Sequence, residues 1–162
     1  MTEQTLKPKT RPGTPRSAAR LAAVQALYQI EMGEDAVARV IKEFHDHRLG
    51  SEIEGDTYIR ADRNLFDDIV SGAWARRSEV DQLIAGHLAE GWTLDRLDRP
   101  MRQILRAGTY ELLARPDVPT AVVITEYVDV AHAFYEPREA AFVNGLLDRV
   151  SSATGRKAAN AK

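Results

Sequence analysis

The sequence predicts an all-α fold. Apolar residues recur at intervals of three and four along most of its 162 positions, the spacing that places side chains on one face of an α-helix. The clearest stretch, Leu97–Val150, divides into three such segments joined by two short loops. No segment keeps the alternating pattern of a strand, and no internal repeat is visible. We therefore expect one helical domain.

The composition suits a protein of the cytoplasm. An apolar content of 44% allows one core, and no apolar run approaches the ~20 residues of a membrane helix. The N-terminus lacks the apolar centre of a signal peptide, so we predict that the chain is not exported. The absence of cysteine excludes disulfides and thiol nucleophiles.

Charge is distributed unevenly along the chain. Residues 1–20 carry five Lys or Arg against one Glu, a net +4, and residues 151–162 carry three basic residues and no acid, a net +3. The total of −2 leaves −9 for residues 21–150. We expect disordered basic tails at 1–15 and 151–162 around a single domain at 16–150. This charge pattern favours a polyanion at the ends and a cationic partner on the body, unless the tails only solubilise the chain.

The N-terminal third predicts two helices and a loop. An alanine- and leucine-rich segment begins at Arg16, and Gly33 offers an end. A second helix is expected from about Asp35, a possible N-terminal cap, to Arg48. The stretch Leu49–Ala61 has two glycines and no sustained period, so we expect a loop there.

A third helix is expected to open near Asp62. Its apolar row begins at Phe66 and continues at helical spacing as far as Leu88, which predicts one long helix. Trp92 and Leu94 then begin a short connector to the next element.

Prolines delimit the three helices of Leu97–Val150. Pro100 suits a first helical turn, where its missing N–H has no intrahelical partner. The Arg115–Pro119 segment separates the first helix from the second. The β-branched run 122–125 resembles a strand, yet the apolar spacing continues helically, so we predict helix. The buried row of the first helix is expected to be Met101, Ile104, Leu105, Gly108 and Leu112.

The last helix is expected to place an aromatic ring at its rim. Val143, Leu146, Leu147 and Val150 form its apolar row. Phe142 falls at the edge of that row and is therefore expected to be half exposed. Gly145 is expected to permit close approach of another helix.

No catalytic or metal-binding motif is present. His45 and His47 are separated by two positions, whereas a helical metal pair needs four. Phosphate loops, dinucleotide fingerprints and nucleophile elbows are missing. We predict a protein that is not an enzyme and uses neither a metal nor a cofactor.

Binding of single-stranded RNA is better supported by the residues. Such binding needs cations to neutralise phosphate and exposed aromatic rings on which bases stack. Arg16 and Arg20, one helical turn apart, supply cations, and Tyr28 and Phe142 are the candidate aromatics.

Three segments carry a resemblance to a known family. AARLAAVQALYQIE, LRAGTYELLARPDVPTAVVITEYVDVAHAF and AFVNGLLDRV resemble, in this order, the NusB family of bacterial transcription antitermination factors. The resemblance implies a compact bundle of about seven helices in two lobes. It also implies binding of the boxA element of nascent ribosomal RNA together with NusE, a small ribosomal protein. The complex then joins RNA polymerase and promotes processive transcription.

The resemblance also implies which residues meet RNA. Arg16 and Arg20 are expected to contact phosphate, and Phe142 to contact a base. Arg138 stands where some relatives carry an acid, and is expected to add a phosphate contact. Tyr28 is expected near the junction of RNA and partner.

The contacts with NusE are assigned to Tyr28, His87 and Asp95. The alternative function is a helical protein-interaction module without direct RNA contact, in which the acidic body alone docks a basic partner. Affinity for immobilised RNA separates these two hypotheses.

Overall fold

The computed structural model describes residues 13–50 and 60–156 of the chain. These residues form seven α-helices, one short 3-10 helix and no strand, which confirms the all-α prediction. The elements are α1 (Pro15–Gly33), α2 (Val37–His47), α3 (Arg63–Ala75), α4 (Arg77–Ala85), η1 (Leu94–Arg96), α5 (Arg99–Ala114), α6 (Thr120–Phe134) and α7 (Pro137–Ala153). None of these helices is long and apolar enough to cross a membrane.

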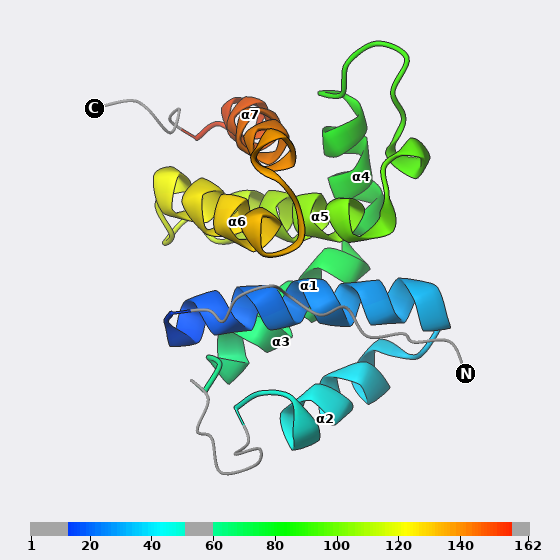
Figure 1. The fold of residues 1–162 in the computed structure, drawn as a ribbon, viewed down its shortest axis with the longest axis vertical. Helices are drawn as coiled ribbons and strands as arrows, with labels where there is room; N and C mark the ends of the chain where they lie inside the picture. Colours follow the sequence, from blue (N-terminus) through cyan, green and yellow to red (C-terminus); the bar gives the residue numbers. More distant parts are fainter. Residues whose placement is uncertain (1–12, 51–59, 157–162) are drawn as a thin grey trace.

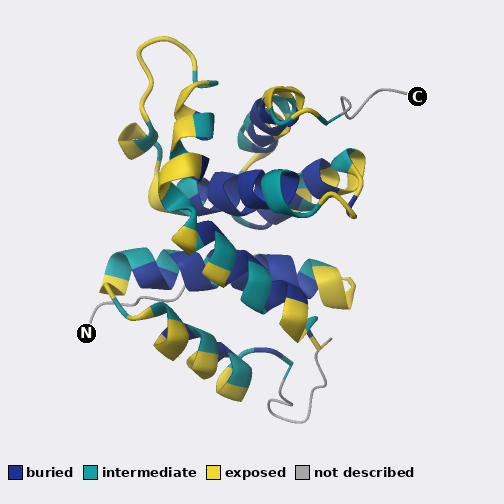
Figure 2. Cartoon of the chain, turned by 180° about the vertical axis from the view of Figure 1, so that it is seen from behind, coloured by how far each residue is buried: buried dark blue, intermediate teal, exposed yellow. Residues whose placement is uncertain are grey.

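The helices form two lobes, as Figure 1 shows: α1, α2 and α3 make the lower lobe, and α4 to α7 make the upper one. Helix α5 joins the two, because it packs against α1 and α3 below and against α4, α6 and α7 above. One continuous apolar core runs through both lobes. The outer face of α2 and the connector between α4 and α5 remain exposed (Figure 2).

Helix α1 begins earlier than its apolar pattern indicated. The hydroxyl of Thr14 accepts a hydrogen bond from the Ser17 amide at 3.0 Å, and Pro15 occupies the first turn. Thr14 and Pro15, which were expected in the tail at 1–15, therefore belong to the start of the helix, and residues 1–12 lie outside the described part. The helix ends at Gly33 as predicted, although it is Glu34 that adopts the left-handed conformation, with φ 55°.

The predicted cap of α2 is wrong, and the loop predicted after this helix lies mostly outside the described residues. Asp35 does not cap the helix, which begins at Val37 with Ala36 in the cap position. The Asp35 carboxylate instead lies 3.8 Å from the guanidinium of Arg39. Most of the predicted loop Leu49–Ala61 falls at 51–59, outside the described residues.

The single helix expected from Asp62 to Leu88 is two helices. The first helix opens at Asp62 as predicted, and the Asp62 carboxylate caps it by accepting a hydrogen bond from the Leu65 amide at 3.0 Å. Arg76, with φ −99° and ψ 23°, then interrupts the helix. The physical reason is that the two apolar rows have different sets of partners: α3 packs against α1 and α5, whereas α4 packs against α5 and α7. A change of direction at Arg76 allows both rows to be buried.

Helices α5, α6 and α7 confirm the sequence-based pattern, including helix over the β-branched run 122–125. The close helix approach lies elsewhere than predicted. A Cβ on Gly145 would meet only the end of the Arg149 side chain, at 3.3 Å. A Cβ on Gly108 would lie 2.9 Å from Cδ1 of the buried Leu147, so Gly108 is where α5 needs glycine to approach α7.

Residues 151–156, which were predicted to belong to the C-terminal tail, are part of the folded domain. Helix α7 continues to Ala153, and Arg156 folds back onto the end of α5. Its guanidinium donates to the carbonyl oxygens of Glu111, Leu112, Arg115 and Val118 and to the Thr120 hydroxyl, at 2.5–3.3 Å. The Leu112 carbonyl oxygen has no backbone donor four positions later, because residue 116 is proline, and Arg156 satisfies it. Residues 157–162 lie outside the described part.

Candidate functional site

Arg20 lies inside the protein. Its side chain is 2% exposed, and its guanidinium forms two hydrogen bonds with the buried Glu111 carboxylate, at 2.7 and 3.0 Å. A third bond, of 3.1 Å, reaches Glu126 on α6. The hydroxyl of the buried Tyr127 also donates to Glu111, at 2.6 Å. Burial alone would lower the pKa of Arg20, but the bond to Glu111 and the surrounding negative charge raise it.

Arg16 and Tyr28 are accessible positions on α1. The Arg16 side chain is 48% exposed, and its Nε lies 3.9 Å from the Asp62 carboxylate at the start of α3. At that distance and exposure the ion pair is weak, which leaves the guanidinium available to an anion. Tyr28 is partly exposed near the other end of the same helix.

A groove opens between the first turns of α7 and the connector that joins α4 to α5. Its volume is about 570 Å³. We call it the connector groove. Its walls are formed by Leu88, Ala89, Trp92, Arg96, Leu97, Asp98, Met101, Tyr135, Arg138, Glu139 and Phe142.

Aromatic and charged side chains surround the connector groove. Trp92 is 50% exposed, with the Arg96 guanidinium 5.1 Å from its ring centre. The Tyr135 hydroxyl donates to both oxygens of Asp98, at 2.8 and 2.9 Å. Burial and the bond to Asp98 raise the pKa of Tyr135 well above its ordinary value, so the hydroxyl stays protonated.

The first turn of α7 carries a cation and a carboxylate. The Arg138 side chain is 92% exposed, and its only ion pair among the described residues is a 3.6 Å contact with Oε2 of Glu139. The other oxygen of Glu139, Oε1, is buried and has no hydrogen-bond partner within residues 13–50 and 60–156. A buried acceptor without a hydrogen bond lowers the stability of the fold. A ligand that donates a hydrogen bond to this oxygen would remove that cost.

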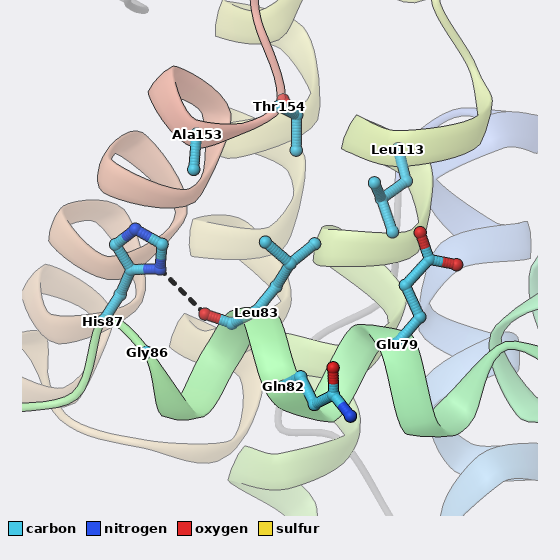
Figure 3. A pocket seen from close by; sticks show the side chains of 8 residues that line it. All are labelled: Glu79, Gln82, Leu83, Gly86, His87, Leu113, Ala153 and Thr154. Atoms are coloured by element: carbon cyan, nitrogen blue, oxygen red, sulfur yellow. Dashed lines mark hydrogen bonds between the residues drawn. The ribbon is translucent and has the colours of Figure 1, made fainter.

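Two of the three residues predicted for partner contact, His87 and Asp95, lie near the two ends of the connector. His87 lines a second pocket, of about 480 Å³, between α4 and the ends of α5 and α7 (Figure 3). Its Nδ1 donates to the Leu83 carbonyl oxygen at 2.8 Å, which fixes the ring. Asp95 is exposed on η1, and hydrogen bonds from Thr93 and its own backbone lower its pKa.

Comparison with known proteins identifies the family. The family model described as "NusB family" matches residues 17–152. A "Transcription antitermination protein NusB" of Novosphingobium aromaticivorans is 62% identical over 139 residues, which cover 86% of this chain and 94% of the relative. The chain belongs to the NusB family.

Solved structures agree with this NusB assignment. T. maritima NusB superposes with a TM-score of 0.71 at 31% identity, covering 86% of this chain and 92% of that one. A structure of the antitermination factors NusB and NusE in complex with double-stranded RNA matches with a TM-score of 0.67 over 85% and 96% of the two chains. At 23% identity, that second likeness shows the fold alone. The relatives are named as transcription antitermination proteins and not as enzymes.

The NusB fold brings together only part of the predicted RNA site. Arg138 and Phe142 share the connector groove. Arg16 and Tyr28 lie on α1 in the other lobe and do not line it (Figure 1). Arg20 is buried and bonded to two carboxylates, so its guanidinium is not available to phosphate, and we leave it out of the proposed RNA interface.

Of the eleven residues that line the groove, sequence reasoning predicted only Arg138 and Phe142 as site residues. Trp92, Arg96, Tyr135 and Glu139 were not among the predicted site residues, yet all four line the groove. The available signal was a tryptophan in a short connector without helical period, followed four positions later by an arginine. An aromatic that no apolar row explains is a candidate for exposure.

Proposed function

We propose that this chain is an RNA-binding antitermination factor that binds the boxA element of nascent ribosomal RNA together with NusE. The complex joins RNA polymerase and keeps transcription processive through termination sites. Family membership supports this function, and a factor acting on nascent bacterial transcripts works in the cytoplasm. The observation that carries the proposal is the connector groove, where exposed aromatics and cations converge.

The groove offers the two ingredients that single-stranded RNA needs. Phe142 and Trp92 are accessible rings on which unstacked bases can lie. Arg138 and Arg96 add positive charge at the same place. Arg16 is a further exposed cation, on α1, and the sequence carries three more basic residues within 1–12, outside the described part.

The contacts with NusE remain a proposal as well. Asp95 is an exposed carboxylate beside the groove, and His87 and Tyr28 are partly exposed. Residues 21–150 carry a net charge of −9, which suits a basic ribosomal protein.

An electrophoretic mobility experiment tests this function. We expect a boxA oligonucleotide to shift more strongly than a scrambled control, and more strongly with NusE than without it. Arg138→Ala should weaken binding and flatten the dependence of log affinity on log salt by about 0.7. Arg39→Ala removes another largely exposed cation, on α2, and is the matched control. Binding of NusE with no affinity for either RNA would favour the protein-interaction module instead.

A further inference from the structure

The connector groove has the size and lining of a site for one ligand group. Its volume of about 570 Å³ falls within the 300–1,000 Å³ typical of small-molecule pockets. Leu88, Leu97 and Met101 supply an apolar surface, and Trp92 and Phe142 add two rings. Trp92 is 50% exposed, so half of a large apolar ring is in contact with solvent. A ligand with a flat apolar face would bury this surface and gain binding free energy from it.

Cations stand beside these rings. The guanidinium of Arg96 lies over the Trp92 ring and also donates to the Gly91 carbonyl at 2.6 Å, which holds it close to the ring. Arg138 projects from the first turn of α7 with 92% of its side chain exposed. An occupant that joins an aromatic plane to an anion matches this arrangement, and a nucleotide is such a group.

Glu139 favours a base that carries a hydrogen-bond donor on its edge. Its Oε1 is the buried acceptor without a hydrogen-bond partner among the described residues. Glu139 lines the groove, and because the terminal torsion of a glutamate is broad, rotation about it can turn the carboxylate toward a ligand there. A carboxylate accepts from the amino group of cytosine, whereas the Watson–Crick edge of uracil sets a carbonyl oxygen on each side of its single N–H.

We propose that the connector groove holds one unstacked, amino-bearing base of single-stranded RNA between Trp92 and Phe142, with Glu139 accepting from its amino group. Arg96 and Arg138 meet the adjoining phosphates. The inference rests on the proposed function. It adds to that function the place where one base binds, the kind of base that is preferred, and a role in RNA binding for the connector between α4 and α5. An apolar side chain of a protein partner fits the rings but leaves Glu139 without a donor, so the nucleotide accounts for more of the groove.

Intrinsic fluorescence can report on this groove selectively. The chain has two tryptophans, and Trp74 stacks with Arg77 outside the groove, at 3.9 Å from ring centre to guanidinium. Trp74→Phe therefore leaves Trp92 as the single reporter and serves as the reference protein. The probes are oligocytidylate and oligouridylate of about ten nucleotides, within the site sizes of single-strand binders.

We expect oligocytidylate to quench Trp92 and to bind the reference protein more tightly than oligouridylate. Adding Trp92→Ala, followed by anisotropy of labelled RNA, should weaken binding of both by about 5- to 150-fold, the range that stacking of one base supplies. Adding Glu139→Gln should reduce the preference for cytidine while RNA binding persists, because the amide can also donate to uracil.

Three outcomes would overturn the inference. Equal affinity of the reference protein for the two oligonucleotides removes the base preference. Unchanged RNA affinity after Trp92→Ala, with boxA still bound, removes the base from the groove and leaves the proposed function standing. Weaker capture of NusE after Trp92→Ala, with RNA affinity unchanged, assigns the groove to the protein partner. Failure of the whole protein to bind boxA with or without NusE would instead contradict the proposed function itself.

Discussion

Arg20 and Glu111 form a two-pronged ion pair inside the protein although they stand 91 positions apart in the chain. The pair joins α1 of one lobe to α5, on which the other lobe is built. Arg20 is 2% and Glu111 0% exposed, and Tyr127 completes the hydrogen bonding of the carboxylate. One of the two arginines that the sequence predicted for phosphate contact therefore holds the lobes together.

Arg20→Ala is expected to destabilise the fold and not to act on RNA directly. Removing one member of a buried pair leaves an unpaired charge and costs about 3–5 kcal/mol. Urea unfolding measures this loss, and Arg16→Ala, at an exposed site, should change stability by no more than about 0.5 kcal/mol. Normal stability with weakened RNA binding in Arg20→Ala would return this residue to the RNA interface.

Gly72→Ala is expected to destabilise the contact between α3 and α5. A Cβ at this position would overlap the ring of Tyr110, whose hydroxyl donates to Asp68 at 2.6 Å. Overpacking of this kind costs about 1–3 kcal/mol, which exceeds the gain of up to ~1 kcal/mol in helix propensity. Ser71→Ala, at the exposed neighbouring position, is the control. Equal unfolding midpoints for the two variants would show that the ring moves aside freely.

Arg156→Ala is expected to lower stability by about 2–3 kcal/mol, because several carbonyl oxygens at the end of α5 lose a charged donor. For a chain of this size that corresponds to a fall of roughly 4–12 °C in Tm. Arg149 makes one exposed bond, to the His87 carbonyl, and its replacement by alanine is the matched control. Similar thermal transitions for the two alanine variants would contradict the stabilising role of Arg156.

Stability should fall with acid partly through Glu31. Burial would raise the pKa of this carboxyl, but hydrogen bonds from Gln103 and Arg106 and the charge of Arg102 hold it below its usual 4.5. Its contribution is therefore complete above about pH 4.5 and is lost as the pH falls through the lower folded value. The stability difference between the natural protein and Glu31→Gln, from urea unfolding at several pH values, should shrink below that pH. A difference that stays constant would refute this linkage.

Local pattern was sufficient for most of the helical architecture. The apolar row from Met101 to Leu112 is buried as predicted, and Phe142 is half-buried at the rim of α7. The break at Arg76 could not be predicted, because no proline or glycine marks it and its cause is the different packing partners of α3 and α4. Sequence spacing says which face is apolar but not which element will cover it.

The site was less predictable for a similar reason. Arg16 and Arg20 are equivalent by spacing, yet only the position of Glu111 on α5 decides that one is exposed and the other buried. The groove joins Trp92 of the connector to Phe142 of α7, two residues that no local pattern relates.

Ultraviolet cross-linking tests the central claim most directly. The protein bound to boxA RNA with NusE would be irradiated, digested and examined by mass spectrometry for peptides that carry nucleotides. We predict cross-links in the connector at Trp92 and in the first turns of α7 at Phe142. Cross-links confined to other surfaces, such as the outer face of α2, would contradict the placement of RNA at the connector groove.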